Sequence, residues 1–182
     1  MKRVLIIVDC QNDFIDGALG TPEAINIVNN VVDKISSESW DNIYTTMDTH
    51  TYDYFGSMEG RKLPVEHCIL HTEGWNLNEK ILDALKDREY TEVRKFTFGS
   101  VTLPNYLLED LEHINMFKNV ECTIIGLCTN ICVISNAMLL KAHFPEMRII
   151  VDASCCAGTT PERHRMALEM MKDCHIDVIN EE

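Results

Sequence analysis

Short apolar runs that alternate with helical patterns constrain the fold of this chain most strongly. Residues 3–8, Arg-Val-Leu-Ile-Ile-Val, form a continuous, largely β-branched run that ends at Asp9. A run that is apolar at almost every position is typical of a central parallel strand covered on both faces. Asp9 then lies at the carboxyl end of this strand, where open α/β sheets bind their ligands.

The same alternation continues to the end of the chain. Further strands are predicted at 42–47 before Asp48, 120–125 before Gly126, 147–151 before Asp152, and 176–179, and a short segment at 91–95 leads into Phe96. Between them lie helical patterns: a helix opened by Thr21-Pro22 with Ile25, Val28, Val32 and Ile35 on one face, and others at 77–85, near 104–111, after Asn130 and after Thr160-Pro161. We therefore predict an α/β fold with three α/β/α layers and a mostly parallel, doubly wound (Rossmann-like) sheet of five or six strands. The 182 residues suit a single domain, residues 1–182.

Charge excludes two classes of partner. The formal net charge is −13 and no cluster of Lys and Arg stands out, which argues against nucleic acid and against an anionic membrane surface. The apolar run after Met1-Lys2-Arg3 is short and is followed at once by polar residues, so it indicates a strand rather than a signal peptide. We expect a cytoplasmic protein, without a membrane span, in which most of the eight cysteines are free thiols.

The stretch from Gly126 to Val133 joins a predicted strand to a helix through a short turn that contains sulfur. Cys132 falls in the first turn of that helix, where unpaired backbone N–H groups favour a thiolate. A cysteine beside a strand is also commonly a small buried hydrophobe. If the strand ends meet at one edge of the sheet, Lys95 is available as a cation and Asp9 as an acid or base for the thiol.

A second group of residues has the composition of a metal site. Asp48 and His50 are two positions apart on an extended chain, and His67 follows in a long irregular segment between 49 and 75. One carboxylate and two imidazoles would leave positions open for water or substrate. His71 is an alternative ligand, and these residue types are also common in polar loops without any metal.

Five motifs in order resemble the isochorismatase-like cysteine hydrolases, and within them the nicotinamidase and pyrazinamidase branch. The motifs are Val8-Asp9-Cys10-Gln11-Asn12-Asp13-Phe14, Asp48-Thr49-His50, Pro64-Val65-Glu66-His67-Cys68, Lys95 before Phe-Thr-Phe-Gly-Ser, and Gly126 to Val133. The tail Val151-Asp152-Ala153 with His164 is also similar, so the resemblance covers nearly the whole chain.

The resemblance implies a role for each matching residue. Cys132 falls at the nucleophile, Asp9 at the general acid/base and Lys95 at the third triad position. The backbone N–H groups of Cys128 and Cys132 fall at the oxyanion hole, next to an expected cis peptide between Leu127 and Cys128. Asp48, His50 and His67 fall at the ligands of a divalent metal, zinc in the first place, with manganese or iron as alternatives. The implied activity is hydrolysis of a small carboxamide, nicotinamide-like or pyrazinamide-like, to an acid and ammonia through a thioester.

Three departures from the pattern concern the substrate and metal sites. Nicotinamidases commonly have a further His a few residues beyond Asp-x-His, whereas this chain has Tyr-Asp-Tyr-Phe at 52–55, which predicts a thinner metal shell or one completed by water. Phe14 is present as one wall of the ring subsite, but Leu63 stands in the region of the opposing Trp. Asn130 occupies a position where Asp is usual.

Two alternatives remain beside the amidase. One is isochorismatase-type vinyl-ether hydrolysis or another C–N hydrolase activity of the same family. The other is a non-catalytic metal-binding or redox-sensing protein, in which Cys128 and Cys132 form a disulfide if their Cβ atoms approach. We expect a small-molecule amide as the partner and, because homo-oligomers are frequent in this family, assembly with further copies of the chain.

Overall fold

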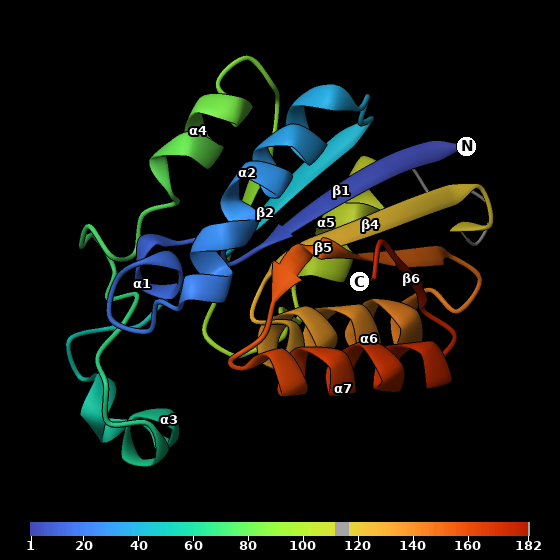
Figure 1. The fold of residues 1–182 in the computed structure, drawn as a ribbon. Coiled ribbons are helices and arrows are strands. Elements are labelled where there is room, and N and C mark those ends of the chain that lie inside the picture. The colour runs from blue at the N-terminus through green and yellow to red at the C-terminus, as the bar shows by residue number, and fades with distance from the viewer. Residues whose placement is uncertain (112–116, 182) are drawn as a thin grey trace.

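A six-stranded, all-parallel sheet organises the molecule. The computed structural model describes residues 1–111 and 117–181, and the sheet runs through it in the order β3-β2-β1-β4-β5-β6 (Figure 1). The strands are β1 (Lys2–Val8), β2 (Asn42–Asp48), β3 (Thr91–Lys95), β4 (Val120–Leu127), β5 (Arg148–Ala157) and β6 (Asp177–Ile179). The expected α/β class and the parallel arrangement are confirmed.

Helices cover both faces of the sheet, as the apolar runs predict. α1 (Asn12–Ile15), α2 (Pro22–Ser37) and α4 (Glu79–Leu85) pack on one face, and α5 (Leu103–Asp110), α6 (Ile134–His143) and α7 (Pro161–Asp173) pack on the other (Figure 1). Strand β1 supplies both cores: Val4, Ile6 and Val8 face the second group of helices, and Leu5 and Ile7 face the first. No helix in the described ranges is long and apolar enough to cross a bilayer.

The strand order of the sheet changes direction between β1 and β4, which makes this place a topological switch point. From β1 it moves outward to β2 and β3, then returns to place β4 on the other side of β1. Val8 pairs with both Thr46 and Gly126, so three strands end together at this point. Open α/β sheets bind their ligands in the crevice at such a switch point, beyond the carboxyl ends of the strands.

Two details differ from the prediction. Strand β5 does not stop before Asp152 but continues to Ala157, because the buried Asp152 carboxylate is paired with Lys34, whose Nζ lies 2.6 Å from Oδ2. The buried face of α2 is formed by Ala24, Ile27, Val28, Val31 and Ile35. Ile25 is therefore exposed and Val32 only partly buried, a rotation of the predicted stripe by about one position.

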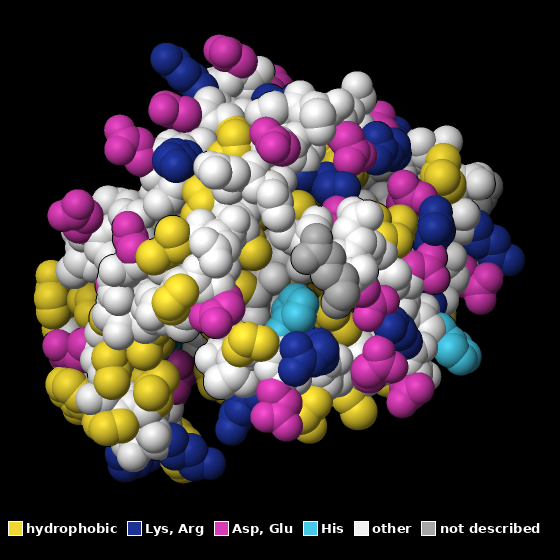
Figure 2. All heavy atoms as spheres, viewed as in Figure 1, with side chains coloured by type: hydrophobic (Ala, Val, Ile, Leu, Met, Phe, Trp, Pro, Cys, Tyr) yellow, Lys and Arg dark blue, Asp and Glu magenta, His cyan; other side chains and the backbone are white. Residues whose placement is uncertain are grey.

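The segment between β2 and α4 has more local structure than its composition suggests. It holds the 3-10 turn η1 (Tyr54–Gly56) and the short helix α3 (Met58–Lys62), whose N-cap Ser57 accepts a hydrogen bond from Gly60 N–H. Figure 2 shows apolar side chains gathered over this segment at the lower left, while acidic side chains are spread over much of the rest of the visible face. The exposed apolar residues here are Tyr52, Phe55, Met58, Leu63 and Val65.

The Lys34–Asp152 pair gives a test of the fold. Burial alone raises the pKa of Asp152, but hydrogen bonds from Lys34, Asn180 and Ser154 outweigh it and hold this pKa below the ordinary 3.8. We expect Asp152→Asn to lower the free energy of unfolding by about 2 kcal/mol at neutral pH, since one charge-assisted contact is lost. Because the folded-state pKa is depressed, the difference from wild type shrinks progressively as the pH falls below about 4.

Urea unfolding at several pH values measures this difference. The matched control is Asp177→Asn, which removes an exposed partner of Arg148 (N–O distance 2.8 Å) and should cost less than about 1 kcal/mol. Equal losses for the two variants, or a pH-independent loss for Asp152→Asn, would contradict the assignment of the buried pair.

Candidate active site

Asp9, Lys95 and Cys132 meet at the switch point of the sheet. Asp9 directly follows β1, Lys95 ends β3, and Cys132 lies in the π-helical turn η3 (Thr129–Val133) that follows β4. Lys95 Nζ lies 2.7 Å from Asp9 Oδ2 and 3.7 Å from Cys132 Sγ. All three side chains are buried, Asp9 completely. The three residues that sequence analysis grouped are therefore in mutual contact through the lysine.

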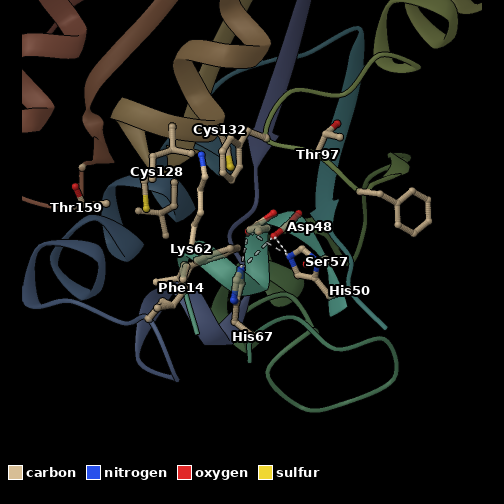
Figure 3. A pocket seen from close by; sticks show the side chains of 18 of the residues that line it. Phe14, Asp48, His50, Ser57, Lys62, His67, Thr97, Cys128, Cys132 and Thr159 are labelled. Carbon is tan, nitrogen blue, oxygen red and sulfur yellow. Dashed lines mark hydrogen bonds and ion pairs between the residues drawn. The ribbon is translucent and has the colours of Figure 1, made fainter. Parts of the chain in front are cut away.

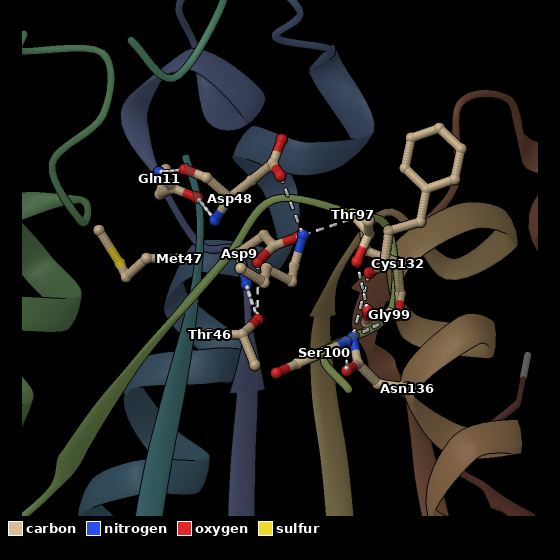
Figure 4. A network of polar contacts seen from close by, with 12 residues as sticks. Asp9, Gln11, Thr46, Met47, Asp48, Thr97, Gly99, Ser100, Cys132 and Asn136 are labelled. Atoms are coloured by element: carbon tan, nitrogen blue, oxygen red, sulfur yellow. Dashed lines mark hydrogen bonds and ion pairs between the residues drawn. The ribbon is translucent and has the colours of Figure 1, made fainter. Parts of the chain in front are cut away.

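The buried carboxylate is held in a defined direction by its backbone and by a threonine. Asp9 has a left-handed φ of 46°, which turns the chain out of β1 at the carboxyl edge of the sheet. The Thr46 hydroxyl donates a 2.6 Å hydrogen bond to Asp9 Oδ1, and Asp9 N–H points back to Thr46 (Figure 4). One carboxylate oxygen is thus fixed by Thr46, and the other faces the Lys95 ammonium.

The directions in which the pKa values of Cys132 and Asp9 are shifted suit a thiol that is protonated at rest and becomes a nucleophile when a base removes its proton. Burial raises the pKa of Cys132, and the negative charge of Asp9 raises it further, while Lys95 opposes both. The expectation of a resting thiolate is therefore not supported by the surroundings of Cys132. Burial also raises the pKa of Asp9, and the Lys95 ammonium limits that rise. A carboxylate with a raised pKa is a stronger base toward the thiol.

The turn that carries Cys132 is fixed by backbone geometry on one side. Gly126 has a φ of 117°, and a Cβ at this position would collide with Val8 of the neighbouring strand, so only glycine fits. The Leu127–Cys128 peptide is cis, as the resemblance implies. The N–H groups of Ile131 and Val133 both donate to Cys128 O. Cys128 and Cys132 are both free thiols.

Side chains from two other segments hold the same turn. Asn136 Nδ2 donates to Cys132 O at 2.8 Å, and Asn136 Oδ1 accepts from Ser100 N–H at 2.9 Å, which ties the turn to the loop after β3 (Figure 4). Asn130 does not cap its own helix: its amide pairs with Thr159 through bonds of 2.9 and 3.1 Å. Asn130, in place of Asp, therefore anchors the turn to the segment before α7.

Next to this triad lies a cluster with the donor set of a metal site. Asp48, His50, Glu59 and His67 each offer one ligand atom, and these atoms all lie within 4.8 Å of one another. The Asp48 carboxylate is 3.1 Å from His50 Nε2 and 3.6 Å from His67 Nε2, and Glu59 is 3.7 and 3.6 Å from the same nitrogens. Ligands bonded to one zinc at about 2.1 Å are separated by about 3.0–3.4 Å, so little movement is needed.

Long-range backbone contacts assemble this cluster. His50 N–H donates to Cys68 O and Leu70 N–H donates to His50 O, so the His67 segment runs beside His50. The Gln11 amide brackets Asp48 by donating to its carbonyl at 2.9 Å and accepting from its N–H at 2.7 Å. The predicted ligands Asp48, His50 and His67 are thus brought together.

Glu59 adds a fourth possible donor to the three predicted from the sequence. It comes from α3, and no sequence signal distinguishes it from Glu66 or Glu73 in the same segment. His71, the proposed substitute ligand, packs against Trp75 instead, with ring centroids 6.0 Å apart.

The electrostatics of the cluster favour a cation. Burial raises the pKa of Asp48, but the two histidines and Lys95 outweigh it and bring the pKa well below its usual range. Burial lowers the pKa of His67, whereas Asp48 and Glu59 raise it, with a net value of about 9. The two carboxylates thus favour a positive charge at this point, which a divalent ion bound to them would supply in place of the proton on His67.

Cys132 and the metal-type cluster line one large cavity, whereas Asp9 and Lys95 are not among its lining residues. Its volume is about 780 Å³, and its wall includes Cys132, Cys128 and the metal-type cluster (Figure 3). Phe14 and Leu63, the predicted substrate contacts, both line it. The remainder of the wall is mainly apolar, with Leu19, Met58, Phe96, Phe98 and Ile131 among its residues. Cavities of about 300–1,000 Å³ with a few polar groups are typical of small-molecule sites.

Comparison with known proteins identifies relatives of the whole chain. The Isochorismatase domain family matches residues 3–182. The crystal structure of nicotinamidase/pyrazinamidase PncA from Bacillus subtilis is 27% identical, with a TM-score of 0.83, over 99% of this chain and 100% of that chain. The nicotinamidase of Saccharomyces cerevisiae is 23% identical over 215 residues, 98% of this chain and 99% of the relative.

A third relative was solved with a metal. The crystal structure of the pyrazinamidase of Pyrococcus horikoshii in complex with zinc shares 24% identity and a TM-score of 0.75, over 100% of both chains. This similarity concerns the fold, since the identity is low. The match to the family covers nearly every residue, including all the strand ends that build the site. The chain therefore belongs to the isochorismatase family.

Proposed function

We propose that residues 1–182 act as one hydrolase domain that cleaves a small carboxamide to an acid and ammonia, with Cys132 as the nucleophile. One observation carries this proposal. Lys95 Nζ contacts both Asp9 Oδ2, at 2.7 Å, and Cys132 Sγ, at 3.7 Å, at the wall of a cavity large enough for a substrate. Nucleophile, base and cation are the groups that acyl transfer to a thiol requires.

In the first half of the reaction, Cys132 Sγ attacks the carbonyl carbon of the amide while Asp9 takes the thiol proton. The Lys95 ammonium stabilises the sulfur as its negative charge develops. The backbone N–H groups of Cys128 and Cys132 then donate to the oxygen of the tetrahedral intermediate. When the C–N bond breaks, Asp9 passes its proton to the departing nitrogen, and ammonia leaves a thioester on Cys132.

In the second half, Asp9 accepts a proton from water as the water oxygen attacks the thioester carbonyl. The C–S bond breaks, the proton returns to sulfur, and the acid leaves the pocket. The same carboxylate therefore serves as base and then acid in both halves. This requires Asp9 to be ionised before each attack, which the neighbouring Lys95 favours.

We further propose that Asp48, His50, His67 and Glu59 hold a divalent metal, zinc in the first place and manganese or iron as alternatives. When bound, such an ion would act as a Lewis acid toward a substrate heteroatom or water. The donor set of two imidazoles and two carboxylates, with atoms within 4.8 Å, supports this assignment. Asp48 also contacts Lys95, at 3.2 Å, so the ligand residue positions the catalytic lysine.

The names of the relatives support an aromatic carboxamide of the nicotinamide or pyrazinamide type as substrate. Phe14 would contact one face of the ring, and Leu63, which is partly exposed at the cavity rim, would contribute an apolar contact in place of an aromatic one. Action in the cytoplasm and assembly into homo-oligomers stay predictions. The free thiols of Cys128 and Cys132 give no support to a disulfide-based sensor.

The nucleophile is tested by Cys132→Ala. We expect the release of ammonia from nicotinamide, pyrazinamide or another carboxamide to fall at least about a thousandfold, because Cys132 is the thiol that the Lys95 ammonium contacts. Cys174→Ala, at an exposed position far from the cavity, is the matched control and should retain activity. Ammonia release that survives Cys132→Ala would show that the chemistry uses a different group.

The role of Asp9 as base predicts a specific pH dependence. The Thr46 hydroxyl donates to the Asp9 carboxylate and so lowers its pKa. In Thr46→Val this stabilisation of the ionised form is lost, so the pKa of Asp9 rises further. We expect the acid limb of kcat/KM to move to higher pH by about one unit. A limb that stays in place, or moves to lower pH, would exclude Asp9 as the titrating base.

The metal ligands are tested by calorimetric titration of metal-free protein with zinc. We expect His67→Ala and Glu59→Gln each to weaken binding by at least about tenfold, since each removes one donor from the cluster. Glu66→Gln is the matched control, because Glu66 is exposed and lies beside His67 but outside the cluster. Equal effects of Glu59→Gln and Glu66→Gln would remove Glu59 from the site.

A further inference from the structure

We propose that Lys62 is a specificity determinant and that the preferred amide carries a carboxylate at the end opposite its carboxamide. This inference rests on the proposed amide hydrolysis and adds a second recognition point to it. Lys62 is the last residue of α3 and lines the same cavity as Cys132. Figure 3 shows its side chain extended into the cavity, toward the wall formed by Cys128 and Cys132.

Lys62 lies on the face of α3 that borders the cavity, although the residue itself is exposed. Glu59 belongs to the metal-type cluster and lies three residues earlier, which places both side chains on one face of the helix. The neighbouring cation, Arg61, is used differently, since its guanidinium donates to Gly56 O at 2.9 Å. Of the two basic residues that end α3, one thus closes the local turn and the other faces the cavity.

Lys62 has no carboxylate partner within the described parts of the chain. Lys62 takes part in no ion pair within residues 1–111 and 117–181, although the chain carries 29 acidic residues. It is also the one Lys or Arg among the residues that line the cavity. Lys62 is exposed at the open side of the cavity, so its ammonium group is accessible to a ligand and suited to pair with an anionic group on it.

The dimensions and the wall of the cavity fit a substrate with two polar ends. About 780 Å³ exceeds what one small ring requires, and the wall of the cavity is mainly apolar. A carboxamide at Cys132 and a carboxylate at Lys62 would leave an apolar body against residues such as Phe14 and Ile131. Asp48 and Glu59 belong to the metal-type cluster, so among the residues that line the cavity Lys62 is the basic side chain with which an anionic group can pair.

The test uses matched substrate pairs in which a carboxylate is replaced by an acetyl group. One pair is rigid, 4-carbamoylbenzoate and 4-acetylbenzamide, and the other is flexible, adipamate and 6-oxoheptanamide. For each pair, the ratio of kcat/KM for the acid to that for the ketone is measured by ammonia release. We expect wild type to prefer the acid of at least one pair and Lys62→Met to reduce that ratio about tenfold, the effect of one charge-assisted hydrogen bond.

Two further variants separate a specific contact from a change in overall charge. Lys62→Arg keeps the cation and should keep the preference for the acid. Lys86→Met removes an exposed lysine at the end of α4 and should leave the ratio unchanged. A ratio that is equal in wild type and Lys62→Met, or a preference for the ketone in both pairs, overturns the proposal.

A binding measurement keeps this test separate from the chemistry. In the Cys132→Ala background, the dissociation constants of acid and ketone are compared with and without Lys62→Met. If Cys132 is not the nucleophile, ammonia release survives Cys132→Ala, and the ratio of the dissociation constants of acid and ketone still measures the effect of Lys62. If Lys62 has no role, ammonia is released but neither ratio responds to the substitution. The absence of any preference for the acid in both assays also overturns the proposal.

Discussion

The contact of one buried lysine with two buried carboxylates is the interaction on which the rest of the site depends. Lys95 Nζ lies 2.7 Å from Asp9 and 3.2 Å from Asp48, so it joins the ends of three adjacent strands. Burying a carboxylate without a partner is costly, and such a group takes up a proton instead. Lys95 therefore favours the ionised form of Asp9, which the proposed mechanism requires, and at the same time contacts Asp48 of the metal-type cluster.

Much of this arrangement is predictable from sequence because it follows from where strands end. Asp9 directly follows a predicted strand, Asp48 follows another, and Lys95 ends the short segment 91–95; parallel strands bring their carboxyl ends to a common edge. Cys132 follows the next run through a glycine whose φ of 117° excludes other residues. The hydrophobic periodicity of the segments and the parallel direction of the strands are enough to predict the fold class and which of these side chains lie near one another.

The residues that were missed act through contacts that leave no periodic signal. Glu59 is one acid among several in an irregular segment, and only the packing of α3 selects it. From the sequence, Asn136 is expected to be an exposed polar residue, yet it is buried and its side-chain amide donates a hydrogen bond to Cys132 O. The sequence predicts that a strand ends before Asp152, because an acid rarely lies inside a buried strand. The strand continues past it because Lys34, which is distant in the sequence, pairs with the buried carboxylate. Each case depends on a partner far along the chain.

The cavity wall combines buried residues of the core with exposed residues of surface segments, and this affects how the substrate specificity of the enzyme can change. The groups proposed to react lie at or just after strand ends inside the core, whereas Lys62 ends the short helix α3 and Leu63, Phe96 and Phe98 come from exposed connections. Substitutions in surface connections usually alter the free energy of unfolding little. New substrates can therefore be acquired one loop residue at a time, while the acyl-transfer chemistry is inherited unchanged.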